Sequence, residues 1–276
     1  MFSKLYNEAI IRLDMETVSP LFIKAAEDSS LDPTAADNTY LAFYKDGELV
    51  PVIPGTSIKG VLRSSAEELI KSQGLEPCNI LDNKQNCAGI LRREQQRLEK
   101  KYSAKEKYDK SCPICKLFGS NVMKSRIYFY DAFPEGEYRI GKRKSVAIDR
   151  ITGASKTNAL FDFEYVEYGR FKAEIKLKNF FGWQLKLLLM LFKRINDGLI
   201  TFGGFTSKGF GRLKIDNIDL ELRYYTKPEI PQGYVKKDYY ISRNLNGIEN
   251  INQALVGISI NQNTVKRCDL ENEQAI

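Results

Sequence analysis

The chain has 276 residues, of which 43% are hydrophobic and 28% charged, and its net charge of +7 is compatible with a polyanionic partner without requiring one. It contains no histidine, which excludes Ser-His-Asp and Cys-His nucleophilic sites and every metal site that needs an imidazole. The longest apolar run, Leu187–Phe192, is too short to span a bilayer and the start MFSKLYNEAI does not resemble a signal peptide, so we expect a cytoplasmic protein without a membrane partner.

The chain opens with a predicted strand followed by a long loop. Residues 5–18 alternate apolar and polar side chains, which predicts a strand with one buried face. Residues 19–41 are rich in turn-forming residues, and loops of this length are usually functional or disordered. Acidic residues in such a segment usually form turns. Those of this loop are Asp28, Asp32 and Asp37.

A predicted hairpin over residues 40–53 leads into a helix that begins at the motif IPGTSIKGVLRS and ends near Ser72. Thr56 or Ser57 is the expected N-cap. Lys59 and Arg63 stand four residues apart and therefore share one face near the helix start. A glycine turn, two hydroxyls and two cations at a helix N-terminus can seat phosphate groups, although such a pair of cations also occurs on helices for solubility alone.

Four cysteines flank a basic stretch, residues 91–110, that is predicted to be a solvated helical arm. Zinc binds four thiolates at tetrahedral corners, and a Cys-Pro-x-Cys turn presents two of them. Unligated thiols and a redox CxxC site remain alternatives, since the first spacing is wider than in zinc ribbons. The four residues are Cys78, Cys87, Cys112 and Cys115.

A strand is predicted over residues 126–133 and a basic, projecting arm over residues 135–160. Two further strands, residues 160–168 and 171–178, are predicted to form a hairpin through Gly169 and Arg170.

A second, buried helix is predicted from Phe180 to Asn196, with Asn179 as its cap. The motif GGFTSKGFGR, residues 203–212, lacks the Gly-Lys-Ser/Thr ending of a P-loop. It either brings its exposed hydroxyls and lysine close to a phosphate or is simply a tight connection between strands. A strand over residues 213–225 follows, and the tail shows weak strand signals near residues 239–241 and 255–260.

The resulting order β-α-β-β-α-β predicts an α+β fold: one ferredoxin-like antiparallel sheet with two helices on one face. We expect a single domain over residues 1–276, with insertions at 74–120 and 135–160 and a C-terminal extension at 226–276.

Four motifs in order, IPGTSIKGVLRS, SCPICKLFGS, VAIDRITGA and GGFTSKGFGR, resemble the RAMP superfamily of CRISPR proteins. The resemblance runs from about Leu13 to Leu213 and is closest to guide-RNA-binding backbone subunits of type III effector complexes, the Csm/Cmr type. It implies an RRM-like palm with a protruding thumb, several copies stacked along the guide RNA, and other subunits of the complex as partners.

The resemblance also implies which residues bind RNA. The palm contacts come from the helix start and from the glycine-rich motif, with Lys208 nearest to phosphate, while the thumb supplies a wedge at Ile148 and a phosphate contact at Arg150. The full set is Thr56, Ser57, Lys59, Arg63, Ile148, Arg150, Thr206, Ser207 and Lys208.

Backbone subunits of this type also cut the bound target RNA with an aspartate that precedes the IPG motif, which corresponds here to Asp37, or to Asp32 as second choice. The RNA 2′-hydroxyl would attack its own phosphate, with the carboxylate assisting and a divalent cation such as Mg²⁺ offsetting charge. The alternatives are a non-catalytic guide scaffold, a guide-processing RAMP endoribonuclease, which commonly uses histidine, and a zinc-ribbon protein unconnected with RNA.

Overall fold

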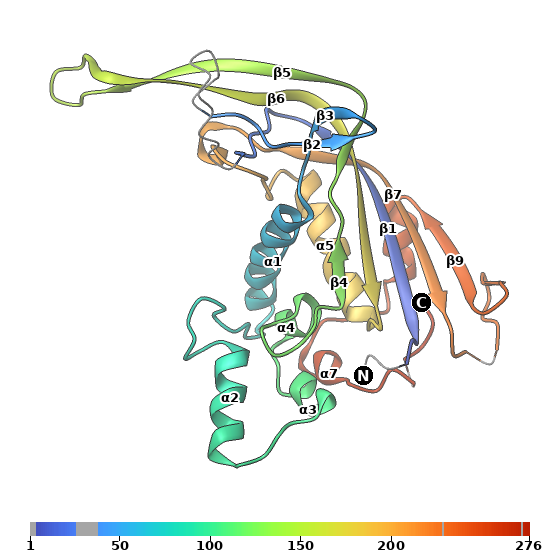
Figure 1. Cartoon of the computed structure of the whole chain (residues 1–276). Coiled ribbons are helices and arrows are strands. Elements are labelled where there is room, and N and C mark those ends of the chain that lie inside the picture. Colours follow the sequence, from blue (N-terminus) through green and yellow to red (C-terminus); the bar gives the residue numbers. More distant parts are fainter. Residues whose placement is uncertain (1–3, 26–37, 228, 272) are drawn as a thin grey trace.

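The computed structural model describes residues 4–25, 38–227, 229–271 and 273–276, and for residues 156–160 the backbone alone. Its centre is an antiparallel sheet in the order β4-β6-β1-β7, covered on one face by two helices (Figure 1). These elements are β1 (Asn7–Thr17), α1 (Gly55–Ser72), β4 (Ile127–Phe129), β6 (Ser155–Lys178), α5 (Gly182–Asn196) and β7 (Leu213–Tyr224). The order is that of a ferredoxin-like fold, which confirms the predicted fold class.

The alternation of side chains along the strands determines which face of this palm is covered. Ile11 pairs with Ile175 and Leu13 with Ala173, and all four side chains are buried beneath the helices. The next residues along each strand carry charges on the opposite face, where Arg12 pairs with Glu174. A slip of one residue would bury these charges, so the pattern fixes the register.

The thumb is a long two-stranded ribbon that projects from one end of the palm (Figure 1). Strand β5 (Phe133–Ile148) pairs with the first three quarters of β6, and the predicted hairpin through Gly169 and Arg170 is wrong. Gly169 continues the strand, opposite Tyr138, and its N–H donates to Thr17 Oγ1 at 3.0 Å. The chain reverses instead after β5, at residues 149–154.

The first insertion contains α2 (Cys87–Arg97), α3 (Ala104–Asp109) and α4 (Pro113–Phe118), so the predicted helical arm consists of two short helices rather than one. It leaves the palm at the opposite end from the thumb, and α1 lies between the two projections (Figure 1). The predicted hairpin that leads into α1 is confirmed as β2 (Ala42–Lys45) and β3 (Glu48–Pro51).

The C-terminal residues enlarge the palm. Strands β8 (Val235–Lys236) and β9 (Ile241–Asn246) extend the sheet beyond β7, and helices α6 (Ile248–Ala254) and α7 (Gln262–Lys266) follow. The strand signal at residues 255–260 is wrong, because Leu255 ends α6 and is buried in the main core. Among the described residues, no helix is long and apolar enough to cross a membrane.

The predicted caps of both palm helices are also wrong. The N-cap of α1 is Pro54 and that of α5 is Phe181. Asn179 instead accepts from the Tyr6 N–H at 2.8 Å and donates to the Lys4 carbonyl, which ties the N-terminal strand to the start of α5.

Candidate RNA-binding interface and cysteine cluster

The N-terminus of α1 is held against the palm by a glycine and an aspartate. The Gly55 N–H donates to Asp131 Oδ1 at 2.8 Å, so a carboxylate from the β4–β5 connection caps the helix. A Cβ on Gly55 would lie 2.5 Å from the Phe129 carbonyl oxygen, which requires glycine in the IPG motif. Because the cap comes from elsewhere, Thr56 remains exposed and Ser57 half-buried beside this helix end.

Lys59 and Arg63, which were expected to act as one pair of phosphate ligands, have different surroundings. Burial, and secondarily the neighbouring Arg63, lowers the pKa of Lys59, and no described residue forms an ion pair with it. The Arg63 side chain is only 13% exposed, and it pairs with Glu67 at 3.1 Å. It also donates to the Gly119 carbonyl and to Cys115 Sγ, so its guanidinium faces the insertion.

The glycine-rich motif contains a single 3₁₀ turn, η1 (Thr206–Lys208), whose side chains are all exposed. Gly211 has φ +84°, and a Cβ there would lie 2.0 Å from the Phe202 carbonyl oxygen, so the return of the loop requires glycine. Lys208 Nζ lies 4.8 Å from the Phe205 ring centre. The predicted presentation of two hydroxyls and a lysine is therefore observed.

An aromatic cluster, which sequence reasoning missed, lies beneath this loop. The Phe22 and Phe205 rings stack at 5.0 Å, and Phe163 and Phe210 pack against them at 4.9 to 6.0 Å. These residues come from the segment after β1, from the thumb base in β6 and from the glycine-rich loop. Their positions are distant in sequence, so no local pattern signals the cluster.

The ends of the acidic loop also lie at the thumb base. The Ala25 N–H donates to the Thr39 carbonyl at 3.0 Å, and the Asn38 N–H donates to the Asp162 carbonyl of β6 at 3.2 Å. The Glu164 N–H returns a bond to the Asn38 carbonyl. The expected catalytic residues Asp37 and Asp32, together with Asp28, lie outside the described residues.

The most exposed apolar side chain at the thumb tip belongs to Ile151, three residues after Ile148, which was expected there. Ile151 is 96% exposed and Ile148 64%. The Asp149 carboxylate accepts hydrogen bonds from the N–H groups of Thr152 and Ile151, which lower its pKa and fix the turn. Arg150 is exposed beside Ile151. The sequence Asp-Arg-Ile-Thr-Gly is the local pattern that indicates this turn, and its glycine has φ +69°.

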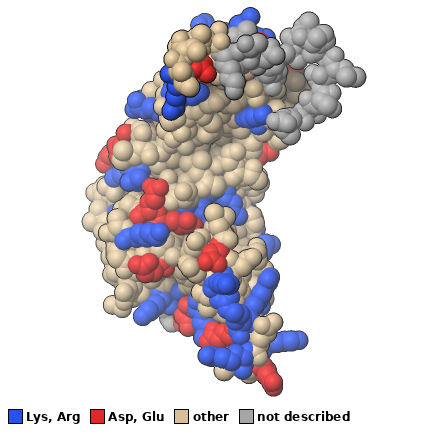
Figure 2. All heavy atoms as spheres, turned by 90° about the vertical axis from the view of Figure 1, so that its left-hand side faces the viewer, with Lys and Arg blue, Asp and Glu red and all other residues tan. Residues whose placement is uncertain are grey.

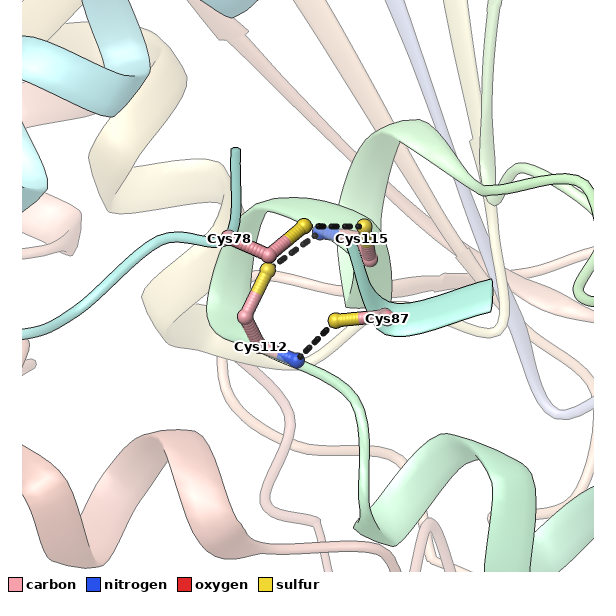
Figure 3. Close-up of side chains that lie close together, drawn as sticks. All are labelled: Cys78, Cys87, Cys112 and Cys115. Carbon is pink, nitrogen blue, oxygen red and sulfur yellow. Dashed lines mark hydrogen bonds between the residues drawn. The ribbon is translucent and has the colours of Figure 1, made fainter. Parts of the chain in front are cut away.

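The four cysteines of the insertion meet in one cluster (Figure 3), with all Sγ atoms within 4.8 Å of one another. Cys78 and Cys115 Sγ lie 3.5 Å apart, and the Cys115 N–H donates to Cys112 Sγ at 3.4 Å. The Cys112 N–H donates to Cys87 Sγ at 3.2 Å. Hydrogen bonds from the Cys115, Cys78 and Cys87 thiols lower the pKa of Cys112.

This donor set fits a metal ion. Zinc–sulfur bonds of about 2.3 Å place tetrahedral sulfurs roughly 3.8 Å apart, close to the spread of the cluster. Backbone N–H groups aimed at two of the sulfurs are suited to stabilising thiolates. The cluster can therefore hold a metal ion between the α1–α2 connection, the start of α2 and the start of α4.

The insertion also contains a strongly basic stretch. Residues 84–110 contain nine Lys or Arg and four Asp or Glu, against a net charge of +7 for the whole sequence. Lys and Arg gather at the lower end of the face that carries α1, where the insertion lies (Figure 2).

A ferredoxin-like sheet with exposed cations on a projecting ribbon is typical of the class of RRM-like, RNA-binding architectures. The sequence model of the RAMP superfamily matches residues 14–214, and the chain belongs to this superfamily. RAMP proteins bind RNA and assemble in CRISPR complexes, so this is a CRISPR-associated protein with an RNA-binding function. No curated protein matches the chain.

Proposed function

We propose that this protein is a guide-RNA-binding backbone subunit of a type III CRISPR effector complex of the Csm/Cmr type, and that it cleaves target RNA paired to the guide. One observation carries the proposal. The segment after β1, residues 20–25, contacts three parts that such a subunit needs: the glycine-rich motif, the thumb base and the loop with the candidate catalytic aspartates. The Gly204 N–H donates to the Phe22 carbonyl and the Gly211 N–H to the Pro20 carbonyl, both at 2.7 Å. The same segment meets the thumb base where Leu21 pairs with Val166 of β6. It meets the far side of the loop that contains Asp28, Asp32 and Asp37 where the Ala25 N–H donates to the Thr39 carbonyl.

Guide binding would use phosphate contacts that are indifferent to sequence. Lys59 at the start of α1 and Lys208 on the 3₁₀ turn are the principal cations, with hydroxyls from Thr56, Ser57, Thr206 and Ser207 beside them. An RNA phosphate would offset the burial that lowers the pKa of Lys59. At the thumb, Arg150 would contact phosphate while Ile148 and Ile151 insert between nucleotides.

Target cleavage would rest on the acidic loop. Asp37, or Asp32 as second choice, would orient or deprotonate the 2′-hydroxyl that attacks the adjacent phosphate, leaving a cyclic phosphate. A divalent cation such as Mg²⁺ would offset charge at that phosphate. The chain has no histidine to take the carboxylate's place.

The decisive experiment measures target-RNA cleavage by the assembled complex with wild-type, Asp37→Ala, Asp32→Ala and Asp28→Ala subunits. We expect Asp37→Ala to abolish cleavage at sites served by this subunit while target binding is unchanged, with Asp28→Ala as the control in the same loop. If all variants cleave like wild type, the subunit is a guide scaffold without catalytic function.

We further propose that Cys78, Cys87, Cys112 and Cys115 hold a structural zinc ion. The protein as purified should contain one zinc per chain, and substitution of any of the four residues should remove it. We also propose that the chain forms one domain, in which residues 74–120 and 135–160 are insertions and residues 226–276 an extension, and that it acts in the cytoplasm beside neighbouring RAMP subunits.

A further inference from the structure

Arg63 connects α1 to the cysteine cluster through three directed contacts. Nε pairs with Glu67 one turn further along α1, at 3.1 Å. Nη1 donates to the Gly119 carbonyl at 3.1 Å, and Nη2 donates to Cys115 Sγ at 3.5 Å. Gly119 is the C-cap of α4, so one guanidinium holds both a cluster sulfur and the end of the helix whose N-cap is Cys112.

The chemistry of the cluster explains a guanidinium at this position. Four thiolates around one divalent cation leave a net charge of about −2, which a neighbouring cation stabilises. Outer partners that donate to metal ligands fix the ligand geometry, and their loss typically costs 10- to 100-fold in metal affinity. Only arginine offers a planar set of donors that can reach the sulfur, the carbonyl and the carboxylate together.

We propose that Arg63 is a positioning residue that couples the metal cluster to the RNA-binding end of α1. It stands one turn after Lys59, so an arginine released by metal loss would loosen the turn that presents this lysine. The inference rests on the proposed zinc site and RNA binding, and it replaces the direct RNA contact expected for Arg63 from the sequence.

The first test needs no RNA. Full-length, zinc-loaded wild type, Arg63→Gln, Arg63→Lys and Lys71→Gln are mixed with a chromophoric chelator, and the rate of zinc release is followed. Lys71 is exposed in the last turn of α1 and serves as the control. We expect Arg63→Gln to release zinc roughly 10- to 100-fold faster, Arg63→Lys to recover part of the difference, and Lys71→Gln to match wild type. Equal rates for all four proteins overturn the proposal.

The second test separates positioning from phosphate contact. Affinity for a single-stranded RNA is measured against salt concentration, with and without prior removal of zinc. A lost phosphate contact makes the slope of log affinity against log salt shallower by about 0.7, as expected for Lys59→Gln. We expect Arg63→Gln to weaken binding with the wild-type slope, and zinc removal to weaken wild type but not Arg63→Gln.

Two outcomes contradict the coupling. If Arg63→Gln makes the slope shallower and keeps wild-type zinc release, Arg63 is a phosphate ligand. If the wild-type protein binds RNA but neither contains nor takes up zinc, the coupling is wrong while the RNA-binding function stands. Circular dichroism of each variant verifies that the palm is folded.

Discussion

The thumb and the first insertion both project from the palm, but different forces hold them. The thumb is held by the backbone pairing of β5 with β6, which three register shifts interrupt, and its base packs on the cluster around Phe163. The insertion's arm, α2 and α3, meets the palm at the cysteines and at Tyr108 of α3, whose ring is 1% exposed and lies 4.1 Å from the Arg126 guanidinium and 6.1 Å from the Phe181 ring. Within the arm, Lys110 pairs with Glu94 at 2.7 Å. A ribbon with its own ladder needs no metal ion, whereas an arm joined at thiolates depends on one.

The largest effect on stability is expected at the insertion, where the cysteines are proposed to hold zinc. In Cys112→Ser, zinc is lost, and the free energy that holds the arm falls by more than about 5 kcal/mol, because structural zinc contributes on the order of 10 kcal/mol to small sites. Hydrogen exchange should accelerate across residues 84–110 and stay unchanged in the thumb. Cys268→Ser, outside the cluster, is the control. Equal acceleration in both projections would show that they are not independent.

The corresponding change at the thumb is Phe163→Ala. Its side chain is 3% exposed and contacts four other rings, so truncation should cost about 3–5 kcal/mol. Urea denaturation measures the loss, and Phe43→Ala, 41% exposed in the β2 hairpin, should cost less than about 1 kcal/mol. Zinc content should be unaffected. A variant that also loses zinc would contradict the separation of the two regions.

These regions could be predicted from the sequence where the deciding interactions are local, and not where the deciding contacts are distant in the chain. The palm was predictable because alternation in β1 and β7 and helical spacing in α1 are local patterns that tertiary packing reinforces. The cysteine cluster was predictable because ligand chemistry restricts which thiols can meet.

The errors arose where the deciding contact is distant in the chain. Gly169 was predicted to form a turn, but it lies within strand β6, where Thr17 Oγ1 accepts its N–H. Asp131, 76 positions from Gly55, caps α1 in place of the local hydroxyls. The contact between Arg63 and the Gly119 carbonyl, 56 positions away, could not be predicted from the spacing of Arg63 and Lys59 either. The spacing of residues in the sequence predicts which side chains share a helix face, but not which element packs against that face.

A smaller effect, on RNA affinity, is expected at the glycine-rich loop. Lys208→Gln removes one phosphate contact on the thumb side and should weaken RNA binding about fivefold, with a salt slope shallower by about 0.7. Because the glycine-rich loop packs on the thumb cluster, this loss should be the same in the wild-type and Cys112→Ser backgrounds. Filter binding across a salt series measures both quantities. A loss that disappears in Cys112→Ser would show that the metal also controls the glycine-rich loop.

The smallest effect on stability is expected at the thumb tip, where function and folding separate most cleanly. Ile151 is 96% exposed, so Ile151→Ala should change the free energy of unfolding by less than about 0.5 kcal/mol. If the tip inserts between nucleotides, the same change should still weaken guide binding several-fold in the assembled complex and alter the nuclease protection of the guide at regular intervals. Ile148→Ala, at 64% exposure, tests the residue expected from the sequence. A larger effect from Ile148→Ala would place the wedge on the β5 side of the ribbon, whereas no effect from either change would contradict insertion of the tip between nucleotides.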